Sequence, residues 1–104
     1  MEELKACPYV ESHSGIDGNG QEYISIVLEE PQIDARNLWF GGLNMVFENN
    51  HKKQRAEAYL SYWRNGVPQY IHAVRTWKGE TLSEAECLKF ATDYARKPEQ
   101  EDKP

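Results

Sequence analysis

The chain has 104 residues and a formal net charge of −5, with 39% hydrophobic residues. This length fits one domain that can bury a modest core without disulfides. No apolar run reaches membrane length, and the start Met1-Glu2-Glu3 lacks the positive charge of a secretory leader. We therefore exclude membrane and secretory classes and expect a cytoplasmic protein whose cysteines, Cys7 and Cys87, are reduced.

The charge is unevenly distributed along the chain. Residues 1–50 carry nine acidic and two basic residues, whereas residues 51–78 carry six basic residues and one acidic residue, Glu57. The acidic total disfavours non-specific binding to duplex DNA, which depends on phosphate neutralisation. Charge segregation of this kind suits orientation on a charged partner.

The first half of the chain predicts short strands separated by turns. Residues 7–14 fit a short edge strand, and the glycine-rich segment 15–20 fits a turn. Residues 23–30 alternate as a strand, with Ile24, Ile26 and Leu28 on one face, and Pro31 ends it. Residues 31–37 read as a loop or single turn. Residues 38–48 form one bent strand or two short ones around the Gly41-Gly42 pair, before a polar loop at 49–54.

The strongest local signal is a β-hairpin formed by residues 56–64 and 67–77. Asn65-Gly66 between them tolerates the positive φ angles of a type I′ turn. A two-residue loop fixes the register, so that Trp63 lies opposite Pro68 and Tyr59 opposite His72. One hairpin face then carries small and aliphatic residues, which we assign to the core: Ala56, Ala58, Leu60 and Tyr62 opposite Arg75, Ala73, Ile71 and Gln69.

The other hairpin face is aromatic and is the candidate partner-binding surface. It carries Tyr59, Trp63, Tyr70 and His72, with Arg64 next to it at the turn. Aromatic side chains with a polar group suit a surface that is partly wet and partly buried in a partner. The alternative is a second core layer, with residues 38–48 or the N-terminus packed over this face.

The C-terminal region predicts one amphipathic helix. Thr81 or Ser83 is its cap, Glu84 would complete a capping box with Thr81, and Pro98 ends the helix after about Arg96. The resulting fold class is α+β: an antiparallel sheet of about four strands with one C-terminal helix packed on one face. We expect a single domain over residues 1–97, with 1–22 loosely ordered, and a disordered acidic tail at 98–104.

Site motifs for metals and catalysis are missing from the sequence. A calcium loop turning at Gly20 would place Gly15 and Ile26 where side-chain oxygens are needed. No CxxC or HxxxH pair is present for zinc, and no GxSxG, P-loop or GxGxxG motif is present for catalysis. We therefore expect no metal, no cofactor and no enzymatic activity.

The opening segment Leu4-Lys5-Ala6-Cys7-Pro8-Tyr9 resembles the LKPCPFCG start of phage-borne restriction-alleviation zinc ribbons. Val10 replaces the second cysteine of that motif, and no later CxxC follows, so the resemblance carries no metal site. What it implies is a phage or mobile-element accessory protein.

These observations predict a small non-catalytic protein-binding module. It would inhibit or regulate a host protein, such as a defence nuclease, by occupying its surface, with carboxylates imitating phosphates. The alternative is a single-stranded nucleic-acid-binding accessory protein that uses the basic and aromatic region 51–78. A homodimer formed through an exposed strand edge is compatible with both functions.

Overall fold

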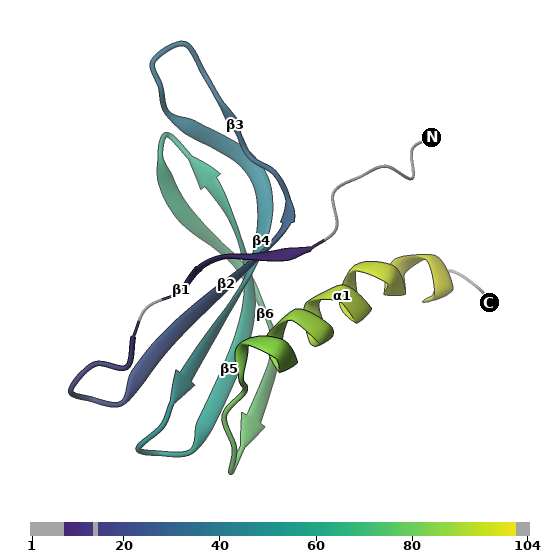
Figure 1. Ribbon diagram of the computed structural model, residues 1–104. Coiled ribbons are helices and arrows are strands. Elements are labelled where there is room, and N and C mark those ends of the chain that lie inside the picture. Colours follow the sequence, from purple (N-terminus) through teal and green to yellow (C-terminus); the bar gives the residue numbers. More distant parts are fainter. Residues whose placement is uncertain (1–7, 14, 102–104) are drawn as a thin grey trace.

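The computed structural model describes residues 8–13 and 15–101 of the chain. These residues form an antiparallel sheet of six strands and one C-terminal helix, α1 (Figure 1). The elements are β1 (Tyr9–His13), β2 (Gln21–Glu29), β3 (Gln32–Ile33), β4 (Trp39–Asn50), β5 (Arg55–Arg64), β6 (Val67–Lys78) and α1 (Glu84–Glu101). The strand order is β1-β2-β4-β5-β6, and β3 pairs with the start of β4.

The antiparallel α+β class is confirmed, but the expected count of about four strands was too low. The two-residue β3 lies inside segment 31–37, which the sequence predicted to be a loop or single turn. Such a short ladder gives no periodic pattern that sequence reasoning can detect. The expected edge strand in residues 7–14 is present as β1, while Cys7 and Ser14 lie outside the described residues.

Of the segment 38–48, residues 39–48 belong to one bent strand, β4, which was one of the two predicted alternatives. Gly41 and Gly42 have φ angles of +72° and +76°, values that favour glycine. A Cβ atom on Gly42 would lie 2.7 Å from the Cα atom of Pro31, so only glycine lets the chain after β2 approach β4 this closely. The bend separates the part of β4 that pairs with β3 from the part that pairs with β2, whereas β5 pairs with Gly41 and again from Asn44 onward.

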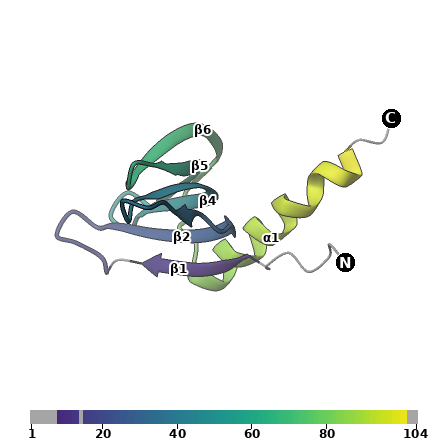
Figure 2. The same ribbon diagram turned by 90° about the horizontal axis from the view of Figure 1, so that it is seen from above.

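The hydrophobic core lies on the face of the sheet that α1 faces (Figure 2). Phe47 of β4 is fully buried, and Phe90 of α1 packs edge-on against it, with ring centroids 6.0 Å apart. Phe90 also packs edge-on against Trp77 of β6. The buried members of the core cluster are Ile24, Ile26, Met45, Phe47, Ala56, Ala58, Leu60, Trp77, Leu82, Cys87 and Ala91.

The buried side chain of Asn49 fastens the segment before α1 to the sheet. Its Nδ2 atom donates to the carbonyl oxygen of Leu82 at 2.7 Å, and its Oδ1 atom accepts from the Leu82 amide at 2.9 Å. An asparagine side chain thus pairs with a backbone peptide as a strand would. Nδ2 also donates to Glu22 Oε1 at 3.1 Å, and His51 lies 2.7 Å from the same oxygen.

Ser83 is the N-cap of α1, the second of the two residues proposed for that role. Its hydroxyl accepts from the Glu86 amide at 3.2 Å, and the Glu86 carboxylate accepts from the Ser83 amide at 2.8 Å. The capping box therefore joins Ser83 and Glu86 rather than Thr81 and Glu84. The helix continues to Glu101, so the predicted end at Pro98 was wrong. A proline removes one N–H donor from a helix but does not always terminate it.

The Asn65-Gly66 turn is present, with φ angles of +53° and +80°, but the register predicted from it holds only near the turn. Ser61 pairs with Tyr70 as expected, whereas Leu60 pairs with His72 and Tyr59 with Ala73. Two β-bulges, at Ile71 and Val74, each insert one residue into β6. Ile71 is 40% exposed rather than buried under the helix, because the first bulge removes it from the ladder.

Candidate functional site

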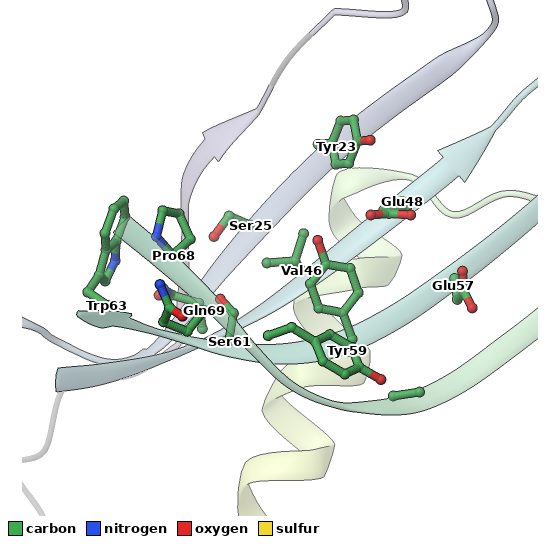
Figure 3. Close-up of a pocket in the computed structure, with 13 residues that line it drawn as sticks. Tyr23, Ser25, Val46, Glu48, Glu57, Tyr59, Ser61, Trp63, Pro68 and Gln69 are labelled. Atoms are coloured by element: carbon green, nitrogen blue, oxygen red, sulfur yellow. The ribbon is translucent and has the colours of Figure 1, made fainter. Parts of the chain in front are cut away.

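A concave cavity of about 610 Å³ lies on the sheet face opposite α1 (Figure 3). Its lining comes from β2 (Tyr23, Ser25), β4 (Asn44, Val46, Glu48), β5 (Glu57, Tyr59, Ser61, Trp63) and β6 (Pro68, Gln69, Tyr70, Ala73). The segment 38–48 was considered as a cover for this face, but its residues 39–48 are part of the sheet as β4. The face therefore contains an open cavity and is not a second core layer built from that segment.

Aromatic residues form the end of the cavity next to the hairpin turn. The rings of Tyr59 and Tyr70 lie 5.4 Å apart, and Tyr70 is 63% exposed. Trp63 lies opposite Pro68 on the neighbouring strand and packs against Trp39 at 6.3 Å between ring centroids. Three of the five predicted partner-binding residues, namely Tyr59, Trp63 and Tyr70, thus line one cavity.

The opposite end of the cavity is acidic. Tyr23, Glu48 and Glu57 are aligned across β2, β4 and β5 as directly opposed residues. The Tyr59 hydroxyl interacts with the carboxylate of Glu48. Burial raises the pKa of Tyr59 well above its ordinary value, and the negative charge of Glu48 raises it further. Tyr59 therefore remains a neutral hydrogen-bond donor throughout the physiological pH range.

Two buried polar side chains, Asn44 and Ser61, lie on the cavity floor between the positions of Trp63 and Tyr59 along β5. They pair with each other across β4 and β5 and are 6% and 3% exposed. Both side chains line the cavity. The amide of Asn44 and the hydroxyl of Ser61 can therefore form hydrogen bonds with a molecule in the cavity.

The other two predicted residues, His72 and Arg64, do not line the cavity. The bulge at Ile71 places His72 opposite Leu60, and its ring Nδ1 atom lies 3.1 Å from the carbonyl oxygen of Ala73. Arg64 is exposed at the end of β5, opposite Val67. The simple hairpin register had placed His72 on the aromatic face because it contained no bulge.

None of the basic residues of segment 51–78 lines this cavity, and three of them, Lys53, Arg55 and Lys78, line a separate shallow pocket at the other end of the β5–β6 pair. Lys52 Nζ donates to the carbonyl oxygen of Gly18, at the loop end of the sheet. The Arg75 guanidinium carbon lies 5.0 Å from the centroid of the Trp77 ring and 5.9 Å from that of Phe90, on the helix side. With Glu48 and Glu57 in the cavity, this face disfavours a phosphate backbone.

Sequence reasoning missed the contributions of β2 and β4 to the cavity. The hairpin alone could locate Tyr59, Trp63 and Tyr70, whereas Tyr23, Asn44 and Glu48 depend on which strands are neighbours in the sheet. A partial signal was present in the alternation of residues 23–29, which placed Tyr23 and Ser25 on the face opposite Ile24.

Comparisons with protein-family models, with curated proteins and with solved structures found no match for this chain. Among the residues that the structure describes, no cluster of three or more His, Cys, Asp or Glu side chains could hold a metal ion. No helix within the described ranges is both long and apolar enough to cross a membrane.

Proposed function

We propose that this protein is a non-catalytic protein-binding module, and that its concave sheet face receives a segment of a partner protein. The single observation that carries the proposal is the open cavity lined by Tyr59, Trp63 and Tyr70. Its volume of about 610 Å³ lies within the range of ligand sites and admits more than one partner side chain.

The composition of the face supports this use. Tyr and Trp rings supply contact area at a low cost in conformational entropy, and their polar groups tolerate partial exposure in the unbound protein. Around the same end of the sheet, further large apolar side chains are exposed, including Trp39, Phe40 and Val67. A buried aromatic centre with additional apolar contacts around it is the usual composition of a binding hot spot.

The difference in composition between the two faces of the sheet also supports the proposal. Buried residues of α1, among them Cys87 and Ala91, belong to the hydrophobic core cluster on one face of the sheet. The other face is then free to keep side chains selected for contact with a partner. Regulation of a host protein by occupying its surface is the form of activity that we propose. The basic residues Lys53, Arg55 and Lys78 lie apart from the aromatic cavity, so the two features that binding of a single strand would combine are on different parts of the surface.

Selection of binders from a random peptide library displayed on phage tests the proposal. We expect peptides that bind the wild-type protein and lose most of their affinity for Tyr70→Ala. Tyr70 is largely exposed, so this substitution should leave the fold intact. The matched control is Ile16→Ala, which truncates an exposed apolar residue outside the cavity. If no enriched peptide depends on Tyr70, the proposal is wrong.

A further inference from the structure

We infer that the cavity binds an arginine side chain of the partner protein, with its guanidinium group between Glu48 and Glu57 and next to Tyr59. The inference rests on the proposed function, because it specifies what the concave face recognises. Figure 3 shows the two glutamates and Tyr59 on the same side of the sheet.

The first argument is the arrangement of charge. Glu48 and Glu57 are directly opposed on adjacent antiparallel strands, and both are half-buried. Like charges in this position repel each other and destabilise the sheet. No basic side chain among the described residues forms an ion pair with either carboxylate. A cation delivered by a partner would relieve the repulsion, so charge complementarity favours a basic ligand.

The second argument is the hydrogen-bonding groups on the cavity floor. Asn44 and Ser61 are more than nine-tenths buried and line the cavity. They can accept from the N–H groups of a bound segment, and Asn44 can also donate to its carbonyl groups. The cavity therefore offers both charge and hydrogen bonds, as binding of a polar segment requires.

The third argument distinguishes arginine from other cations. Two carboxylates without a third acidic or histidine ligand are a poor metal site, in line with the lack of a larger cluster in the described residues. A guanidinium is planar, has five donors for two carboxylates, and stacks on tyrosine rings such as those of Tyr59 and Tyr70. Lysine has a compact, strongly hydrated ammonium group that cannot contact both carboxylates and a ring face in this way.

The probes are the peptides from the library selection whose binding depends on Tyr70. We expect these peptides to be enriched in arginine relative to the unselected library. Replacing the arginine with citrulline, which keeps the shape and removes the charge, should weaken binding by about tenfold or more. The Glu57→Gln variant should weaken binding of the arginine peptide by about the same factor. The citrulline peptide should bind this variant and the wild-type protein with similar affinity, because the two changes remove the same contact between the guanidinium and Glu57.

Glu29→Gln is the matched control, since Glu29 is exposed on β2 and does not line the cavity. It should bind the arginine peptide with wild-type affinity. Thermal unfolding of each variant shows whether its fold is retained. Because Glu48 also has the larger effect of the two carboxylates on the Tyr59 hydroxyl, we choose Glu57 for the substitution.

The outcomes separate this inference from the proposed function. Tyr70-dependent peptides without arginine, or with arginine that citrulline replaces at no cost, overturn the inference and leave the protein-binding proposal in place. Peptides enriched in lysine instead of arginine overturn the assignment to a guanidinium group. A selection without any Tyr70-dependent peptide overturns both.

Discussion

Asn49 shows how a single buried polar residue determines the position of an element. Its side-chain amide satisfies both the amide and the carbonyl group of Leu82, immediately before the helix cap. Leu82 is itself buried in the core cluster, so its backbone groups have little access to water. The loop before α1 can enter the core only because this side chain supplies the hydrogen bonds.

Replacing Asn49 with alanine should lower the free energy of unfolding by about 2–4 kcal/mol, because it leaves two buried backbone groups of Leu82 without partners. Urea unfolding followed by tryptophan fluorescence measures the effect. Asn19→Ala, at an exposed position, should change stability little. A similar small loss for both variants would contradict the role assigned to Asn49.

Cys87 predicts a pH dependence of stability. Burial raises the pKa of its thiol from 9.0 to about 12, with smaller contributions from neighbouring glutamates. The folded state therefore holds this proton more tightly than the unfolded state, so the contribution is present below pH 9 and is lost as pH rises towards about 12.

The measurement is a series of urea unfolding curves across this alkaline range. We expect the stability of the wild-type protein to decline with rising pH and the decline to be shallower in Cys87→Ala. A residual decline is expected in that variant, because the pKa of Tyr59 is raised as well. Equal slopes in both proteins would refute the contribution of Cys87.

At the scale of elements, the pairing of β4 with β5 places Glu48 directly opposite Glu57. Glu57→Gln should therefore increase the free energy of unfolding in the absence of a ligand, by about 0.2–1 kcal/mol, because it removes a cross-strand repulsion. Urea unfolding at low salt tests this, with Glu80→Gln at an exposed position outside the sheet as control. A loss of stability would mean that the Glu57 carboxylate makes a favourable contact in the unbound protein.

The start of α1 allows a direct test of the capping assignment. Ser83→Ala removes the hydroxyl that accepts from the Glu86 amide and should lower the free energy of unfolding by about 1 kcal/mol. Thr81→Val removes the hydroxyl of the alternative cap while keeping its shape, and it should have a smaller effect. The reverse order would restore Thr81 as the cap.

Local sequence patterns could predict the strands and the helix better than they could predict strand register and the pairing of strands that are distant in sequence. Asn65-Gly66 identified the hairpin because two consecutive positive φ angles are a local requirement. The bulges at Ile71 and Val74 were not predictable in the same way, because they depend on how β6 follows the twist of the sheet. The sequence predicted only the aromatic residues of the cavity, Tyr59, Trp63 and Tyr70. The residues Tyr23, Asn44 and Glu48 lie on β2 and β4, and their positions beside the hairpin follow from the strand pairing, which local patterns do not give.

At the scale of the whole molecule, the two faces of the sheet differ in composition. The helix side holds the apolar core, while the concave side combines an aromatic end, a polar floor and an acidic end. Exposed apolar residues are also present along the outer strand β6, but its two bulges and Pro68 interrupt the regular edge that another strand would need for pairing. The concave face is therefore the surface best suited to a partner.

The most direct test of this claim is to map by NMR which backbone amide signals shift when a library-selected peptide binds the protein. The account predicts that the largest shifts belong to cavity-lining residues of β2, β4, β5 and β6, among them Tyr23, Ser61 and Tyr70. Shifts concentrated on α1, or along the outer edge of β6 without the cavity residues, would contradict it.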